Sequence, residues 1–299
     1  MKTRRNIFIA FILNLSFSIF EVLGGIFTGS IAIISDAVHD FGDAASIGLS
    51  YFLEKKSQKQ PDEKYTYGYA RYSVLGGFIT TLILFIGSVL MIYNAIIRII
   101  TPVDVNYDGM IVYSVIGICV NFFAAFITRE GNSINQKAVN LHMLEDVLGW
   151  VVVLAGAIIM RFTNFTLIDP LMSIAVSIFI LINATRNLKE IFDLFLEKAP
   201  HDIETAEIMK HIEEIDGVLD VHHIHIWSMD GQNNFATLHV VTDSECSEIK
   251  DLIREELREH NIGHVTIETE TSAEHCHERH CHVEIHSHSG HCHHHGHHH

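Results

Sequence analysis

Two segments, His39-Asp-Phe-Gly-Asp43 and His142-Met-Leu-Glu-Asp146, decide the fold of this chain. Each is a His-x-x-x-Asp pair inside a stretch apolar enough to cross a membrane. Because positions i and i+4 share one face of a helix, each pair directs an imidazole and a carboxylate the same way. Ionisable groups at membrane depth are costly and usually functional. Two such helices would together offer four ligands to a divalent metal.

The composition indicates a membrane protein with an acidic soluble part. The chain has 299 residues, of which 48% are hydrophobic and 19% charged. Residues 1–195 consist mostly of apolar runs, whereas residues 197–299 hold most of the acids and nearly all the His. The net charge of −16 argues against nucleic acid as a partner. Neither segment reads His-Glu-x-x-His, so a zinc protease is excluded, and no catalytic or cofactor-binding residue is predicted.

Six apolar runs have the length of about 20 residues that a membrane-spanning helix needs. They are Ile7–Phe27, Ile31–Leu53, Val74–Ile97, Met110–Ile127, Ala138–Met160 and Leu167–Asn187. Lys and Arg gather before the first run, between the second and third, and between the fourth and fifth. The positive-inside rule predicts that both termini of this six-span protein are cytoplasmic. We expect the protein in the plasma membrane.

After residue 200 the hydrophobic period changes to that of a small soluble domain. Asp202–Glu214 and Glu245–His260 have helical periods, whereas Val218–Trp227, Asn234–Val241 and His264–Glu270 alternate like strands. The order α-β-β-α-β predicts an α+β domain of ferredoxin or metallochaperone type. We therefore expect a membrane domain over residues 1–199, a cytoplasmic domain over 200–271 and a disordered tail over 272–299.

The predicted site has ligands suited to zinc. Two carboxylates offset the charge of a divalent cation, and two imidazoles favour Zn²⁺ over Mg²⁺ or Ca²⁺, which prefer oxygen ligands. Since a His must be neutral to bind metal, protons and metal compete for the site. The alternative is that His39, Asp43, His142 and Asp146 only hydrogen-bond between packed helices.

Small and polar residues recur along the same spans. Asn14, Ser18 and Glu21 form a polar stripe that could line an aqueous path or merely join helices. Glycines in the spans indicate close helix packing rather than chemistry; they are Gly24, Gly25, Gly76, Gly77 and Gly149.

The sequence resembles the cation diffusion facilitator family of zinc exporters over nearly all of residues 6–270. The resemblance rests on Ser35-Asp-Ala-Val-His-Asp-Phe-Gly-Asp43, Tyr67-Gly-Tyr-Ala-Arg71, His142-Met-Leu-Glu-Asp146, Asp169-Pro170 and His223-Ile-His-Ile-Trp227. It implies a homodimeric, proton-coupled efflux carrier with six spans and a metallochaperone-like domain. It also implies that the transport ligands are His39, Asp43, His142 and Asp146. Manganese-selective relatives look like Asp-x-x-x-Asp in both spans, which this chain does not have.

Two further sites of the family are altered here. Some relatives bind a second metal between spans two and three with one Asp and two His, where this chain has Asp62, Tyr65 and Tyr69. Neutral Tyr is a poor zinc ligand, so no metal is expected there. Other relatives bind two metals in the cytoplasmic domain with several His and an Asp. The matching residues here, and hence the possible cytoplasmic site, are His222, His239, Glu268 and Glu270.

The tail has the composition of a metal-binding segment. Residues 275–299 hold 13 of the 23 His and three of the five Cys. Its paired candidate ligands are His275, Cys276, His277, His280, Cys281 and His282. A purification tag could explain the terminal His run, but the Cys-His pairs upstream favour a native tail.

These observations predict proton-coupled zinc efflux by alternating access, with cadmium or cobalt as further substrates. Zn²⁺ would be the substrate and a regulatory ligand, protons the counter-ion, and no cofactor is expected. One alternative is a membrane-anchored zinc sensor or buffer, which would not need charged ligands at bilayer depth. A passive channel is the other, although channels favour weak rings of carbonyls or carboxylates.

Overall fold

A computed structural model describes residues 2–28, 31–101, 107–130, 133–163 and 168–274. Within these ranges it leaves undescribed the side chains of residues 2, 24–28, 31–39, 107–110, 160–161, 168–169, 172–173 and 176. The chain forms two compact units. One comprises Met1–Pro200 with Trp227–Asn234, and the other begins at His201 and holds the rest of the chain.

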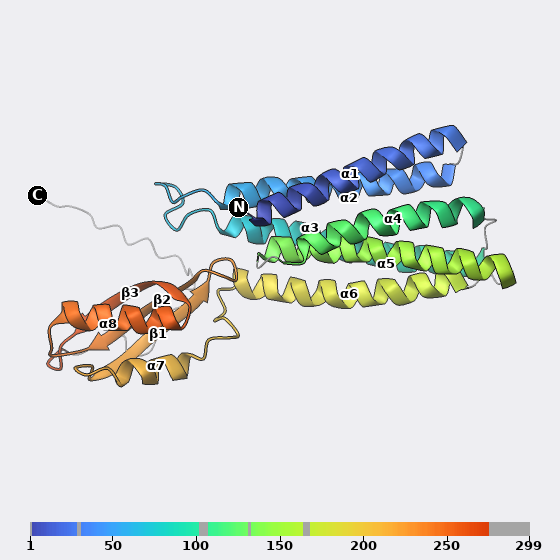
Figure 1. Ribbon diagram of the computed structural model, residues 1–299. Helices are drawn as coiled ribbons and strands as arrows, with labels where there is room; N and C mark the ends of the chain where they lie inside the picture. Colours follow the sequence, from blue (N-terminus) through green and yellow to red (C-terminus); the bar gives the residue numbers. More distant parts are fainter. Residues whose placement is uncertain (1, 29–30, 102–106, 131–132, 164–167, 275–299) are drawn as a thin grey trace, which may run out of the picture. The chain divides into compact units, whose positions relative to one another are not determined.

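The first unit is a bundle of six long helices (Figure 1). They are α1 (Lys2–Thr28), α2 (Ile31–Ser57), α3 (Arg71–Ile100), α4 (Tyr107–Thr128), α5 (Ile134–Thr163) and α6 (Ile168–Phe195). Helices of this length extend about 33–45 Å at 1.5 Å per residue, enough for a hydrocarbon core of about 30 Å. Helix α5 is central, because it contacts α1, α2, α3, α4 and α6.

The helices of this unit expose large apolar side chains and bury polar ones, the opposite of helices in a soluble bundle. Large apolar side chains such as Phe52, Phe122 and Phe179 are exposed, while Asn14, Ser18 and other polar residues are buried. An apolar exterior with polar side chains buried inside the bundle is the pattern expected of helices surrounded by lipid. The stripe of polar residues predicted along the first span thus faces the inside of the bundle.

Four helices meet the length and composition of a membrane span when only described residues are considered. These spans are Thr3–Leu23, Arg71–Ile100, Ile111–Thr128 and Ile134–Ile159, in α1, α3, α4 and α5. The prediction that α2 and α6 also cross the membrane is carried into the proposal below.

The second unit holds two helices and most of a three-stranded sheet. Its elements follow the predicted order: α7 (Thr205–Glu213), β1 (Asp220–Ser228), β2 (Asn234–Val241), α8 (Cys246–Glu259) and β3 (Ile262–Glu270). The sheet order is β1-β2-β3. The Phe235 ring contacts His264 near one end of the β2–β3 pair, and Thr242 N donates to Glu270 O at the other, so β2 and β3 are parallel.

One face of this sheet holds the hydrophobic core. Ala236, Leu238 and Val240 of β2 pack with buried apolar residues of both helices, so α7 and α8 cover the same face. Because side chains alternate along a strand, the odd-numbered residues of β2, including His239, lie on the opposite face. This open face carries the His and Glu residues of the predicted cytoplasmic site.

Candidate metal centre

Helices α2 and α5 bring three of the four predicted transport ligands together. One ligand atom each of Asp43, His142 and Asp146 lies within 4.8 Å of the others. His142 Nε2 is 3.7 Å from Asp43 Oδ1, and both residues are buried, with exposed fractions of 3% and 6%. The fourth predicted ligand, His39, lies in α2 one turn before Asp43, but its side chain is outside those described.

The ring of His142 lacks the partners that a structural His would have. Among the described residues, neither Nδ1 nor Nε2 has a hydrogen-bond partner. Most buried polar atoms are hydrogen-bonded, because an unpaired one costs free energy. A buried imidazole beside two carboxylates is therefore suited to a ligand that completes the site, such as a cation.

A buried polar network ties together the helices that carry these ligands. Glu54 Oε2 of α2 accepts hydrogen bonds from Ser73 Oγ of α3 at 2.7 Å, Ser133 Oγ at 3.1 Å and Asn135 Nδ2 of α5 at 3.2 Å. Asn135 Nδ2 also donates to the Ser50 carbonyl oxygen at 3.0 Å. The network lies two to three helical turns from the ligands, so it fixes the register of α2 against α5.

The predicted cytoplasmic residues meet on the open face of the sheet. Ligand atoms of His222, His239 and Glu270 lie within 4.8 Å of one another. His239 Nδ1 is 2.7 Å from Glu270 Oε1, and His222 Nε2 is 3.6 Å from Glu270 Oε2. Glu268 lies at the rim: its Oε2 is 3.6 Å from His239 Nε2, and its side chain is 70% exposed. Two imidazoles and a carboxylate again form a donor set suited to zinc.

An irregularity in β1 aims His222 into this cluster. The next residue, His223, has a φ of 50°, in the left-handed region that L side chains rarely adopt. Both Val221 and His222 are buried, and the alternation resumes in the opposite phase at Ile224 and Ile226. One extra residue in a strand is a β-bulge, a device common next to functional sites. The sequence pattern predicted the strand but contained no signal for the bulge.

In the segment between α2 and α3, polar groups form hydrogen bonds with one another. Tyr69 donates its hydroxyl to Asp62 Oδ2 at 2.6 Å, while the backbone N–H groups of Lys64 and Tyr65 donate to Oδ1. The Tyr69 hydrogen bond lowers the pKa of Asp62, and the same bond raises the pKa of Tyr69 to about 12. A hydroxyl that stays protonated at neutral pH is a poor zinc ligand.

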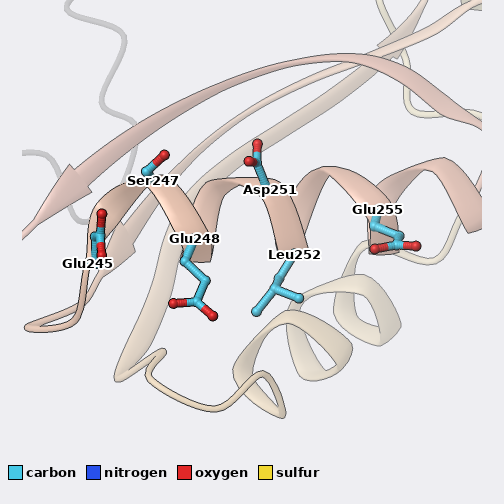
Figure 2. A pocket seen from close by; sticks show the side chains of 6 residues that line it. All are labelled: Glu245, Ser247, Glu248, Asp251, Leu252 and Glu255. Atoms are coloured by element: carbon cyan, nitrogen blue, oxygen red, sulfur yellow. The ribbon is translucent and has the colours of Figure 1, made fainter.

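An acidic hollow on α8 has different chemistry. Figure 2 shows that it is lined by Glu245, Ser247, Glu248, Asp251, Leu252 and Glu255. It contains neither imidazole nor thiolate, so it lacks the ligands that distinguish zinc from other divalent ions. The tail ligands predicted at residues 275–282 lie outside the described residues.

The helical bundle and the sheet unit correspond to two known domains that occur together. Residues 7–196 match the model of the cation efflux transmembrane domain, and residues 200–272 match that of the cation efflux protein cytoplasmic domain. The chain belongs to the cation efflux family. This is the cation diffusion facilitator family that the motifs resemble, and it makes the protein a membrane-integral transporter.

Bacterial relatives match nearly the whole length of the chain. The chain is 33% identical to the cadmium, cobalt and zinc/H(+)-K(+) antiporter of Bacillus subtilis, over 92% of this chain and 91% of the relative. It is 32% identical to the zinc transporter ZitB of Yersinia pseudotuberculosis, over 91% and 88%. It is also 32% identical to the metal cation efflux system protein CzcD of Cupriavidus metallidurans, over 89% and 86%. These matches cover both domains.

Proposed function

We propose that this protein exports zinc from the cytoplasm in exchange for protons, with His39, Asp43, His142 and Asp146 as the transport ligands. The observation that carries the proposal is the buried cluster of Asp43, His142 and Asp146, in which the imidazole has no hydrogen-bond partner among the described residues. Alternating access would expose this cluster first to the cytoplasm and then to the other side.

The choice of substrate rests on the donor set and on the relatives. Two imidazole nitrogens and two carboxylate oxygens suit Zn²⁺, and also Cd²⁺ or Co²⁺, better than Mg²⁺ or Mn²⁺. The names of the relatives specify cadmium, cobalt and zinc in Bacillus subtilis and zinc in Yersinia pseudotuberculosis. Both lines of support favour a zinc exporter that also accepts cadmium and cobalt.

Proton coupling follows from the chemistry of the same ligands. His142 must be neutral to bind zinc, and it can carry a proton when zinc has left. Asp43 and Asp146 lie beside His142, and protons compete with zinc for their carboxylates as they do for the imidazole. Protonated ligands could therefore return the empty site across the membrane, as the antiporter name of the Bacillus subtilis relative also suggests.

The proposal assigns a role to each part of the chain. Residues 1–199 would form a transport domain of six spans, including α2 and α6, in the plasma membrane with both termini cytoplasmic. Residues 200–271 would form the cytoplasmic domain of a homodimer, as the family resemblance and the match to the cytoplasmic domain model suggest. The cluster of His222, His239, Glu268 and Glu270 would bind zinc as a regulatory ligand. Residues 272–299 would capture metal.

Flux into vesicles tests the transport site. Full-length protein is reconstituted in vesicles that enclose a zinc-sensitive dye, and initial zinc uptake is measured with and without an acidic lumen. The wild type should accumulate zinc uphill when the lumen is acidic. Asp43→Ala and Asp146→Ala should each lower the flux strongly, because each removes a direct metal ligand. Loss of a residue that only supports a ligand already costs roughly 10–100-fold, and the effect here should be larger. Asp62→Ala removes a carboxylate outside the cluster and should leave the flux unchanged.

The alternatives give different results in the same assay. Zinc binding without flux in the wild type would identify a sensor or buffer. Flux that ignores both the pH gradient and a protonophore would identify a channel or uniporter. Near-normal flux in folded Asp43→Ala protein would remove the cluster from the mechanism.

A further inference from the structure

A second group of metal-binding side chains lies between the ends of the two helices of the cytoplasmic domain. His211 is in the last turn of α7, Glu256 is in the last turn of α8, and His260 caps the C-terminus of α8. The three side chains are half-buried, with exposed fractions of 35%, 28% and 26%. None of them belongs to the transport cluster or to the sheet cluster.

The three ligand atoms have nearly the spacing of a zinc site. His211 Nδ1 is 2.9 Å from His260 Nε2 and 3.1 Å from Glu256 Oε1, and His260 Nε2 is 3.3 Å from Glu256 Oε1. Ligands bound tetrahedrally at about 2.0–2.1 Å from a zinc ion are about 3.3 Å apart. All three distances are within a few tenths of an ångström of that value.

Hydrogen bonds alone cannot satisfy all three of these ligand atoms at once. Each of the three atoms faces the other two, but a neutral imidazole has only one N–H, and an ionised carboxylate has none. One N–H among the three atoms leaves two lone pairs facing each other, whereas an N–H on each imidazole leaves the two N–H groups facing each other across 2.9 Å. A cation accepts all three lone pairs at once.

The surrounding backbone also favours positive charge. The negative ends of helix dipoles lie at helix C-termini, and His211, Glu256 and His260 all lie at the C-terminal end of a helix. Both helices cover the core face of the sheet, whereas His239 and Glu270 belong to the opposite face. The sheet therefore separates the two clusters within the domain.

We propose that His211, Glu256 and His260 bind a divalent cation of the zinc class, with a fourth position open to water. Two imidazoles and one carboxylate form a donor set that Zn²⁺ and Co²⁺ both accept. A bound ion joins the end of α7 to the end of α8. Zinc in the cytoplasm thereby stiffens the helical layer of the domain, independently of the transport step.

Amide hydrogen exchange tests this site in the full-length chain. All proteins carry His222→Gln and His239→Gln, so that the sheet cluster lacks its imidazoles. Zinc at about 100 times its Kd should slow exchange in peptides covering the last turns of α7 and α8 at least about tenfold. His211→Gln and His260→Gln should abolish this protection. Glu255→Gln, which removes the neighbouring carboxylate that lines the hollow in Figure 2, should retain it.

A second variant, read out by spectroscopy, distinguishes loss of a ligand from loss of folding in the His→Gln proteins. His260→Cys replaces one ligand with a thiolate, so adding Co²⁺ should produce a sulfur-to-cobalt charge-transfer band beyond that of the parent chain. Glu255→Cys places a thiol directly before Glu256 in the sequence, on the side of α8 that lines the acidic hollow, and should add no band. Equal bands in the two variants, or zinc protection that survives both His→Gln changes, would overturn the proposal.

Discussion

The surroundings of His225 shift the pKa of its ring in the cytoplasmic domain. The rings of His223, His225 and His239 lie together, with ring centroids 4.9 Å apart for His223 and His225 and 4.8 Å apart for His223 and His239. Partial desolvation lowers the pKa of His225 below its ordinary value of 6.5, and the charges of His223 and His239 lower it further. The folded domain therefore binds fewer protons at His225 than the unfolded chain does.

The sign of the pH dependence follows from this direction. With a folded pKa below 6.5, stability is at its full value above pH 6.5 and decreases as the pH falls toward the folded pKa. Imidazole chemical shifts of the metal-free, full-length protein should show His225 titrating below 6.5. His223→Gln should move that pKa upward, because it removes a like charge. His201→Gln, outside the group, should not move it, and an unmoved pKa in His223→Gln would contradict the assignment.

Residue types and spacing predicted much of the candidate site. Two i, i+4 pairs in apolar runs were enough to place Asp43, His142 and Asp146 on facing sides of α2 and α5. The cluster of His211, Glu256 and His260 was missed, although Glu256 and His260 also have the i, i+4 spacing. A single such pair in a polar helix is common, and only the packing of α7 against α8 supplies the third ligand. The bulge at His223 was also missed, because the residue types of the strand contain no marker for a positive φ there.

At the scale of elements, hydropathy located the helices and underestimated their length. The run predicted over Val74–Ile97 is part of α3, Arg71–Ile100. Hydropathy marks the part of a helix that lies in hydrocarbon, whereas backbone hydrogen bonding continues into the flanking turns. Strand β2 has the predicted bounds, Asn234–Val241, but β1 begins two residues late because Val218 N donates to Ile215 O in a turn.

Glycines in the bundle divide into those that packing requires and those that it does not. A Cβ at Gly76 or Gly77 would lie 2.8 or 2.9 Å from the side chain of Asn135 or Ile134, so these glycines permit the predicted close approach of α3 to α5. The same prediction for Gly149 was wrong, since nothing lies within 4 Å of its Cβ position. Gly117 of α4 was missed: a Cβ there would be 2.6 Å from the Trp150 ring.

Gly117 and Gly149 form a matched pair for testing helix packing. Gly117→Ala should force the Trp150 indole away from α4, at a cost of about 1–3 kcal/mol for overpacking. Gly149→Ala should be neutral or stabilising, because Gly costs about 0.5–1 kcal/mol relative to Ala inside a helix. The measurement is the thermal unfolding midpoint of full-length protein in detergent. Equal midpoints for the two variants would mean that α4 and α5 do not pack in this register.

For the whole molecule, the predicted domain organisation rests on a change of solvent. Helices in lipid are apolar outside, so the change of composition near residue 200 predicts the end of the membrane domain there. The proposed dimer could not be derived in this way, because a partner surface differs little in composition from the rest of the surface. It rests on the family, not on the physics of the single chain.

The tail gives a prediction at the scale of the whole transport cycle. Residues 275–299 carry 13 His and three Cys, all covalently linked to the transporter. Metal held by a linked segment stays at high effective concentration near the entrance of the pathway. The tail offers few apolar residues for packing, so it is not expected to contribute to the conformational step that sets the maximal rate.

Deleting residues 275–299 should therefore raise the zinc concentration needed for half-maximal flux while leaving the maximal rate nearly unchanged. The measurement is initial flux against free zinc for the full-length and shortened chains. A full-length chain with every His and Cys of this segment replaced by Asn or Ser should behave like the deletion, because it keeps the length and lacks the ligands. If the maximal rate collapses in both variants while their thermal unfolding stays unchanged, the tail belongs to the transport machinery. Metal capture would then be the wrong role, since a segment that only concentrates zinc cannot limit a site that is already saturated.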